Sequence, residues 1–252
     1  MADISDYLSL AEIAYTRRGS ETPRISGWTA MDREYATWSG NGFQGVIFEG
    51  QEEVIVALAG TMGGVTTAPI SQNSANLRIG LHIIPNMAGS GKQLVKSALG
   101  FGKPVSIVGH SLGGALAQVI GAWTGRPFIS FNGPGMARHL RLSAVNIFKP
   151  RQMRRSINAL GSDEVVGVCF NVRGDFVGGF GSHIGTLVEL NAVATANGRH
   201  DLDTIRLSLG MLVNEEPKYW HPWFTFKRVA ESAPQVAEPD LGESFGDMFG
   251  DF

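Results

Sequence analysis

The stretch "VSIVGHSLGGALAQVIGAW", residues 105–123, joins two local patterns at a single serine. Before Ser111, the β-branched run 105–109 is typical of a buried strand, and after it apolar residues recur at helical spacing as far as Trp123. The neighbouring glycines and alanines leave room for a sharp turn between strand and helix. A serine at such a turn is exposed at the sheet edge and suited to nucleophilic attack, so we predict that Ser111 is a nucleophile. The alternative is a small residue that merely fits a tight turn.

The rest of the chain alternates strand and helix patterns. This alternation predicts an α/β fold, with a mostly parallel sheet flanked by helices on both faces. Residues 61–90 lack a firm period. The expected strands are 43–50, 52–60, 103–109, 127–133 and 164–172, and the expected helices are 3–17, 91–99 and 112–123.

Composition limits the partners and the compartment. The 252 residues carry a net charge of −2 without a long basic cluster, which argues against nucleic acid as a partner; Arg151, Arg154 and Arg155 are interpreted as a solvated face or loop. The lone Cys169 rules out an intramolecular disulfide framework and is expected in the core. Neither a secretory signal nor a stretch of about 18 apolar residues is present. We expect a cytoplasmic protein, or one exported by a route that is independent of a signal peptide.

The domain organisation is expected to be simple. Residues 1–228 are predicted to form one domain with a lid near 62–90, and residues 229–252, which carry acids and no base, a flexible tail. The segment "KYWHPWFTFKR", residues 218–228, mixes aromatic and basic side chains. It is suited to transient contact with a membrane surface, or equally to packing against the domain.

Several segments together resemble the class 3 lipases. "VGHSLGGALA" (108–117) looks like their nucleophile segment, "VIVALAGT" (54–61) like their oxyanion strand and "SFNGPGMA" (130–137) like their next strand end. "FNVRGDFV" (170–177) and "RHDLDTIRL" (199–207) resemble the segments that carry the catalytic aspartate and histidine. The resemblance implies an α/β-hydrolase fold and a serine carboxylester hydrolase that cleaves acyl esters of glycerolipids through an acyl-enzyme. It implies no cofactor, and leaves lipase and phospholipase A1 activity open.

A serine nucleophile needs a base and a group that orients the base. Position along the chain leaves three histidines for the base: His183, His200 and His221. The resemblance favours His200. Asp175 directly follows a predicted strand, where an acid faces the active-site edge, and is preferred as the acid over Asp163, Asp201 and Asp203.

Two donors are expected in an oxyanion hole. One is the backbone N–H of Leu112, directly after the serine, and the second, by resemblance, is Thr61. No histidine or acid spacing indicates a metal site. Two other functions stay open: a non-catalytic interaction module on the same fold, and an acyltransferase or thioesterase. An inhibitory or chaperone protein partner is not identified by any motif.

Overall fold

A computed structural model describes residues 2–16, 24–31, 43–60, 74–161, 166–193, 198–216 and 220, and over 74–86 only the helical backbone. Its centre is a seven-stranded sheet whose strands lie in chain order from β1 to β7. The first two pairings are antiparallel and the other four parallel. The strands are β1 (Thr29–Ala30), β2 (Gly45–Glu49), β3 (Val54–Leu58), β4 (Val105–His110), β5 (Phe128–Phe131), β6 (Gly167–Val172) and β7 (Thr186–Leu190).

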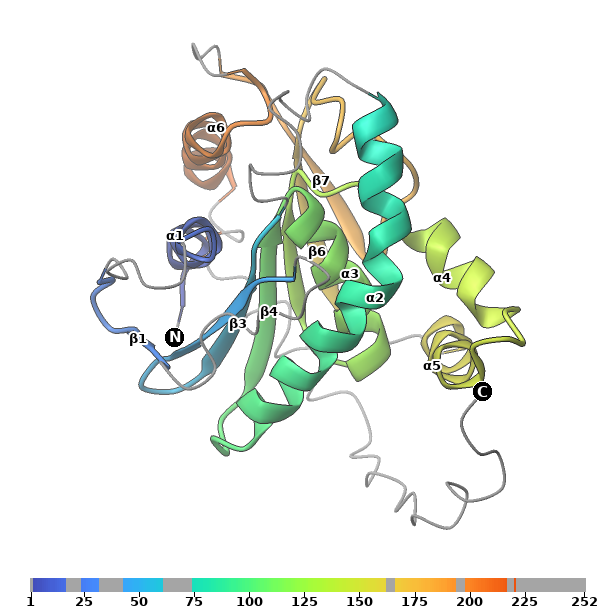
Figure 1. Ribbon diagram of the computed structural model, residues 1–252. Helices are drawn as coiled ribbons and strands as arrows, with labels where there is room; N and C mark the ends of the chain where they lie inside the picture. The colour runs from blue at the N-terminus through green and yellow to red at the C-terminus, as the bar shows by residue number, and fades with distance from the viewer. Residues whose placement is uncertain are drawn as a thin grey trace.

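Helices cover both faces of this sheet. On one face lie α1 (Ile4–Ile13) and α6 (Leu202–Glu215), and on the other α2 (Ser74–Leu99), α3 (Leu112–Thr124), α4 (Ala137–Ala144) and α5 (Pro150–Leu160), as Figure 1 shows. The predicted α/β-hydrolase architecture, a mostly parallel sheet between helices, is therefore confirmed. Because parallel strands all end at one edge, the loops after β4, β5 and β6 gather there.

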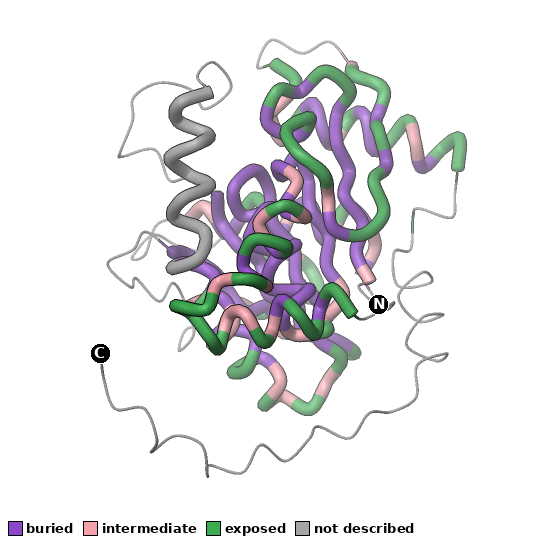
Figure 2. The backbone as a smooth tube through the Cα atoms, turned by 90° about the vertical axis from the view of Figure 1, so that its right-hand side faces the viewer, coloured by how far each residue is buried: buried purple, intermediate pink, exposed green. Residues whose placement is uncertain are grey.

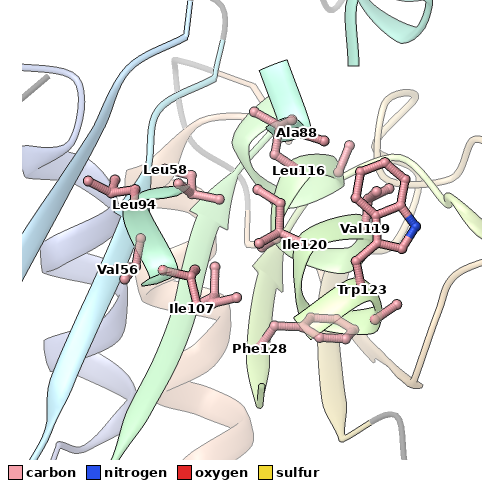
Figure 3. Close-up of a cluster of buried hydrophobic side chains, with 14 of the residues drawn as sticks. Val56, Leu58, Ala88, Leu94, Ile107, Leu116, Val119, Ile120, Trp123 and Phe128 are labelled. Atoms are coloured by element: carbon pink, nitrogen blue, oxygen red, sulfur yellow. The ribbon is translucent and has the colours of Figure 1, made fainter. Parts of the chain in front are cut away.

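Each face has its own apolar core. Strands β3 and β4 are buried at every position, so alternate side chains enter opposite cores. Val56, Leu58 and Ile107 pack with α2 and α3 in one core, where Trp123 and Phe128 complete the cluster drawn in Figure 3. The other core lies beneath α1 and α6. Cys169 is fully buried in the first core, as expected, and burial raises the pKa of its thiol to about 12.

The segment before residue 91 differs from the prediction. Helix α2 runs without a break from Ser74 to Leu99, so the expectation of a helix over 91–99 alone was wrong for residues 74–90. Pro85, Gly89 and Gly91 hide the helical period in the sequence. Gly91 packs closely against α3, since a Cβ there would require the terminal methyl of Ile120 to shift. Of the expected lid near 62–90, residues 62–73 lie outside the described residues, and a lid remains a prediction.

Other elements were partly or wholly missed. The predicted strands and the helices at the N-terminus and after Ser111 are present with ends shifted by a few residues. Helices α4 and α5 and strands β1 and β7 were not predicted. β7 alternates exposed and buried residues over only five positions, too short a pattern to separate from a loop. The predicted acidic tail, residues 229–252, lies outside the described residues.

Candidate active site

Ser111 occupies the junction between β4 and α3. Its backbone has φ 58° and ψ −126°, a region that non-glycine residues rarely adopt, and its side chain makes no capping bond to the helix. Two glycines permit this turn. A Cβ at Gly109 would strike the main chain of Gly113, and one at Gly113 would strike the carbonyl of Leu58 on β3. The helix can therefore start directly against the sheet, which aims the serine hydroxyl at the strand-end edge.

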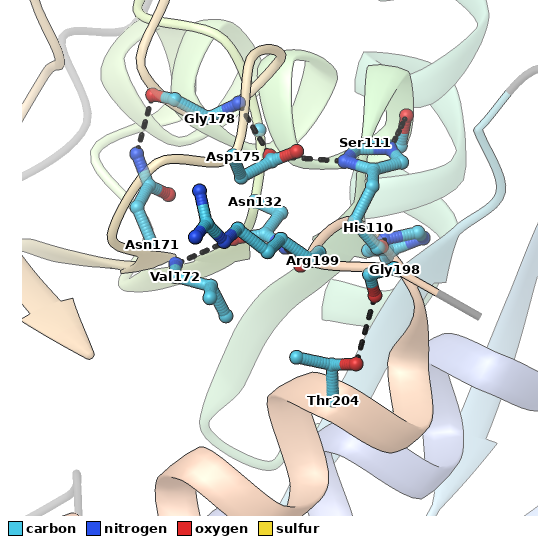
Figure 4. A network of polar contacts seen from close by, with 12 residues as sticks. His110, Ser111, Asn132, Asn171, Val172, Asp175, Gly178, Gly198, Arg199 and Thr204 are labelled. Atoms are coloured by element: carbon cyan, nitrogen blue, oxygen red, sulfur yellow. Dashed lines mark hydrogen bonds and ion pairs between the residues drawn. The ribbon is translucent and has the colours of Figure 1, made fainter. Parts of the chain in front are cut away.

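The hydroxyl of Ser111 meets a histidine and an aspartate from later loops. His200 Nε2 lies 2.8 Å from Ser111 Oγ, and His200 Nδ1 lies 3.0 Å from Asp175 Oδ2, as drawn in Figure 4. Asp175 follows β6, and its Oδ2 also accepts the backbone N–H of Gly178 at 2.7 Å. The exposed fractions of the two side chains are 2% for Asp175 and 17% for His200. The carboxylate is thus held out of water while the imidazole keeps limited access to solvent.

The loop that carries His200 is anchored by Asn132 at the end of β5. The Asn132 amide donates to the carbonyl of Arg199 at 2.9 Å and accepts from the N–H of Val172 at 2.8 Å. Asn132 itself has a positive φ of 45° and is fully buried. This one side chain links the loops after β5 and β6 to the residue before His200. The sequence analysis missed it, although an asparagine at the end of a buried strand was the available signal.

His110 lies under the ring of His200. The centroids of the two imidazole rings are 4.8 Å apart. His110 Nε2 donates to the carbonyl of His200 at 2.9 Å, so its Nδ1 is left to accept from the Tyr15 hydroxyl at 3.0 Å. Burial, with the neighbouring His200 as a second cause, lowers the pKa of His110 to about 3. A neutral imidazole therefore supports the main chain of His200.

The buried His110 predicts acid sensitivity. An unfolded histidine binds a proton near pH 6.5, whereas His110 in the fold binds one only near pH 3. Between these values the unfolded chain holds more protons, so stability is lost as the pH falls below 6.5. We expect His110→Gln, which keeps a donor and an acceptor, to lose less stability than the parent between pH 7 and pH 4, by on the order of 3 kcal/mol.

Urea unfolding at each pH measures this difference. His139 and His183 also have pKa values lowered by burial, but both remain in parent and variant, so the difference isolates His110. If the free energy of unfolding fell equally with pH in the two proteins, His110 would not be the group that causes the acid sensitivity.

The competing site candidates lie elsewhere or serve other contacts. His183 Nε2 is 2.9 Å from Asn171 Nδ2 and 3.0 Å from the carbonyl of Gly133. The Asp201 side chain caps α6, accepting from the N–H of Asp203 at 2.9 Å. His221 and Asp163 lie outside the described residues. Among the described candidates, only His200 and Asp175 are brought to Ser111.

For the oxyanion hole the structure describes one of the two expected donors. Leu112 is the first residue of α3, where a backbone N–H has no partner within the helix and the helix dipole favours negative charge. Thr61 lies outside the described residues. The preceding Gly60 lies against Ser111, since a Cβ there would be 3.3 Å from the serine Cβ and would collide with the Tyr15 hydroxyl.

The described ranges contain neither a candidate metal site nor a helix that could span a membrane. There, no three His, Cys, Asp or Glu side chains are grouped so as to hold a metal ion. No helix in the described part of the chain is both long and apolar enough to cross a bilayer.

Comparisons with known proteins identify one matching family. The model of a family described as phospholipase-like, a Tle-like phospholipase domain, matches residues 9–178, a range that contains Ser111 and Asp175. No curated protein matches the sequence significantly.

The solved structures that resemble this chain include lipases and an esterase/lipase of low sequence identity. A Rhizomucor miehei lipase in a propeptide complex is similar over 73% of this chain and 66% of its own, just under two thirds, with 13% identity and a TM-score of 0.42. A mutant form of MDLA from Penicillium cyclopium gives 12% identity over 75% and 79% of the two chains, with a TM-score of 0.41. An esterase/lipase from an uncultured bacterium gives 12% identity over 89% and 98%, with a TM-score of 0.35.

Proposed function

The chain belongs to the phospholipase-like family with a Tle-like phospholipase domain, and we propose that it hydrolyses acyl esters of glycerolipids as a serine hydrolase. Ser111 is the nucleophile, His200 the general base and Asp175 the group that orients His200. Phospholipids are the first substrates to test, because the family is described by that activity. The observation that carries the proposal is the unbroken hydrogen-bonded row from Ser111 Oγ through both nitrogens of His200 to Asp175.

The proposed reaction has two steps, acylation of Ser111 and hydrolysis of the acyl-serine. Ser111 Oγ attacks the acyl carbonyl carbon while its proton passes to His200 Nε2, and the carbonyl oxygen becomes an oxyanion beside the N–H of Leu112. The tetrahedral intermediate expels the glycerol oxygen, which takes the proton from His200 and leaves an acyl-serine. Water then repeats the attack with His200 as base, releasing the fatty acid and restoring Ser111. Thr61 is proposed as the second oxyanion donor.

The surroundings of Asp175 suit an acyl chain. Phe176 and Phe180, which follow Asp175 in the loop after β6, have exposed fractions of 48% and 38%. An apolar rim of this kind is expected where a fatty chain enters a site. Its presence favours lipid esters over small polar esters.

Release of fatty acid tests the proposal. The purified chain is incubated with phospholipid vesicles and with emulsified triacylglycerol, and Ser111→Ala serves as the matched blank. A fluorophosphonate probe followed by peptide mapping should label Ser111. Release by the parent alone supports the proposal, and the preferred lipid distinguishes phospholipase from neutral lipase. Absence of both release and labelling would favour a non-catalytic module, while turnover of acyl-CoA without lipid hydrolysis would favour a thioesterase or acyltransferase.

A further inference from the structure

Charge is distributed very unevenly along the chain. Between Glu53 and Asp163 there is no aspartate or glutamate, although the interval contains eleven lysines and arginines. The remaining sequence therefore has thirteen more acids than bases, and the net charge of −2 conceals this separation. The bases of the interval are Arg78, Lys92, Lys96, Lys103, Arg126, Arg138, Arg141, Lys149, Arg151, Arg154 and Arg155.

The fold turns this separation along the sequence into a separation in space. The interval contains α2, α3, α4 and α5, which make up the helical layer on one face of the sheet (Figure 1). No helix of this layer has a carboxylate to offset its bases. Figure 2 looks onto the layer, where much of α4 and α5 is exposed.

Lys92 and Lys96 on α2, and the cations of α4 and α5, have no acidic partner within the described part of the chain. Among the described side chains, neither Lys92 and Lys96 nor any arginine or lysine of residues 137–155 forms an ion pair with a carboxylate. They also repel one another: burial lowers the pKa of Lys92, and the positive charges of Arg155, Lys96 and Arg151 lower it further. Gathering like charges costs folding free energy. A surface that keeps them without acids between them is suited to an anionic partner.

Apolar side chains are exposed on the same surface. The turn between α4 and α5 presents Val145 and Ile147, each 71% exposed, and Phe148, 89% exposed. Leu142, Ile157 and Leu160 add exposed apolar area on the two helices. Single exposed apolar residues are ordinary, but a group of them protruding among cations that have no described acidic partner is not.

We propose that the α4–α5 surface, residues 137–160, docks the protein onto an anionic lipid surface. Arg138, Arg141, Lys149, Arg151 and Arg154 contact acidic headgroups, and Phe148 with its neighbours enters the acyl boundary. The two contributions reinforce each other, since cations near an anionic leaflet and buried apolar area each add to membrane affinity. The choice of a bilayer rests on the proposed function, because a phospholipid hydrolase has to reach its substrate in a membrane.

The apolar side chains beside the cations favour a bilayer over other anionic partners. The phosphates of a nucleic acid duplex would satisfy the cations but would offer no apolar region to the 89% exposed Phe148 and its apolar neighbours. A leaflet accommodates both, because the acyl boundary lies directly beneath the phosphates.

Vesicle flotation of the full-length Ser111→Ala chain tests docking separately from hydrolysis. We expect binding to phosphatidylglycerol-rich vesicles, weak binding to phosphatidylcholine vesicles, and release by high salt. Replacing Arg151 and Arg154 by Gln should weaken binding by about fivefold for each cation removed. Phe148→Ser should weaken it by about tenfold or more. Leu207→Ser and Arg206→Gln are the matched controls, since both residues lie on α6 on the opposite face, and their binding should equal that of the parent.

The outcomes separate the docking surface from the catalytic proposal. Vesicle binding that depends on Phe148 and on the arginines supports the proposed docking surface, even if the parent protein, which keeps Ser111, releases no fatty acid. Equal binding to both kinds of vesicle, or binding unaffected by the α4–α5 substitutions, would overturn it. Capture of polyglutamate without vesicle binding would also overturn it, by assigning the surface to an acidic polypeptide.

Discussion

Ser111→Ala is expected to lower kcat for lipid or ester hydrolysis by about a millionfold and to leave the fold intact. The hydroxyl supplies the atom that attacks the acyl carbon, and no neighbouring group in the described site can replace it. His200 Nε2, 2.8 Å away, would have no nucleophile to deprotonate except water. A small residual rate would come from substrate binding and the oxyanion donor alone.

Stability should change little in this variant. Among the described residues, the serine side chain makes one hydrogen bond, to His200, and a single bond of this kind contributes about 1 kcal/mol. Alanine has the same Cβ as serine, so the backbone at φ 58° gains no new clash. Thermal unfolding followed by circular dichroism checks this point.

Ser156→Ala is the matched control. Ser156 is also fully buried, but its hydroxyl accepts from Trp123 Nε1 at 3.0 Å on the helical layer, away from His200. The control should lose some stability and keep its turnover. If Ser111→Ala retained turnover in the purified chain, Ser111 would not be the nucleophile.

The fold was predictable because its signals are local. The buried run before Ser111, the helical spacing after it and the glycines between them specify a strand, a turn and a helix from adjacent residues. Gly125 ends α3 at a positive φ of 64°. The resemblance to class 3 lipases is confirmed at the level of the family. α4 and α5 were missed because their exposed faces mix apolar and basic residues, which blurs the helical period.

The site was predictable to a smaller extent because its supports are distant in sequence. Asp175 could be placed at the strand-end edge from the sequence, since it directly follows a strand. The contact between His110 and His200 spans 90 residues, and that between Asn132 and Arg199 spans 67. Neither contact leaves a local pattern in the sequence, so both can be recognised only in the folded structure. The roles of Ser111, Asp175, His200 and Leu112 remain predictions for kinetics to test.

Asp175→Asn is expected to lower kcat by about ten-thousandfold while preserving the shape of the site. The N–H of Gly178 and His200 Nδ1 both contact the same oxygen, Asp175 Oδ2, so an asparagine whose amide nitrogen takes that place would face His200 Nδ1 as a donor and give up the Gly178 bond. His200 would have to shift its proton to Nε2, leaving no acceptor for the Ser111 hydroxyl at 2.8 Å. The imidazole would stay in place in the wrong tautomer. Most of the loss should therefore appear in kcat rather than KM.

Asp201→Asn separates this role from a general effect of acids near His200. Asp201 adjoins His200 in sequence and competed with Asp175 as the predicted acid, but its side chain caps α6 through the N–H of Asp203. Asparagine caps helices as well as aspartate does, so this variant should keep both stability and kcat. The two substitutions are chemically identical and differ only in the contact they change. Loss of activity in Asp201→Asn with retention in Asp175→Asn would reverse the assignment of the acid, whereas the expected order would leave the Asp175 carboxylate as the group that orients His200.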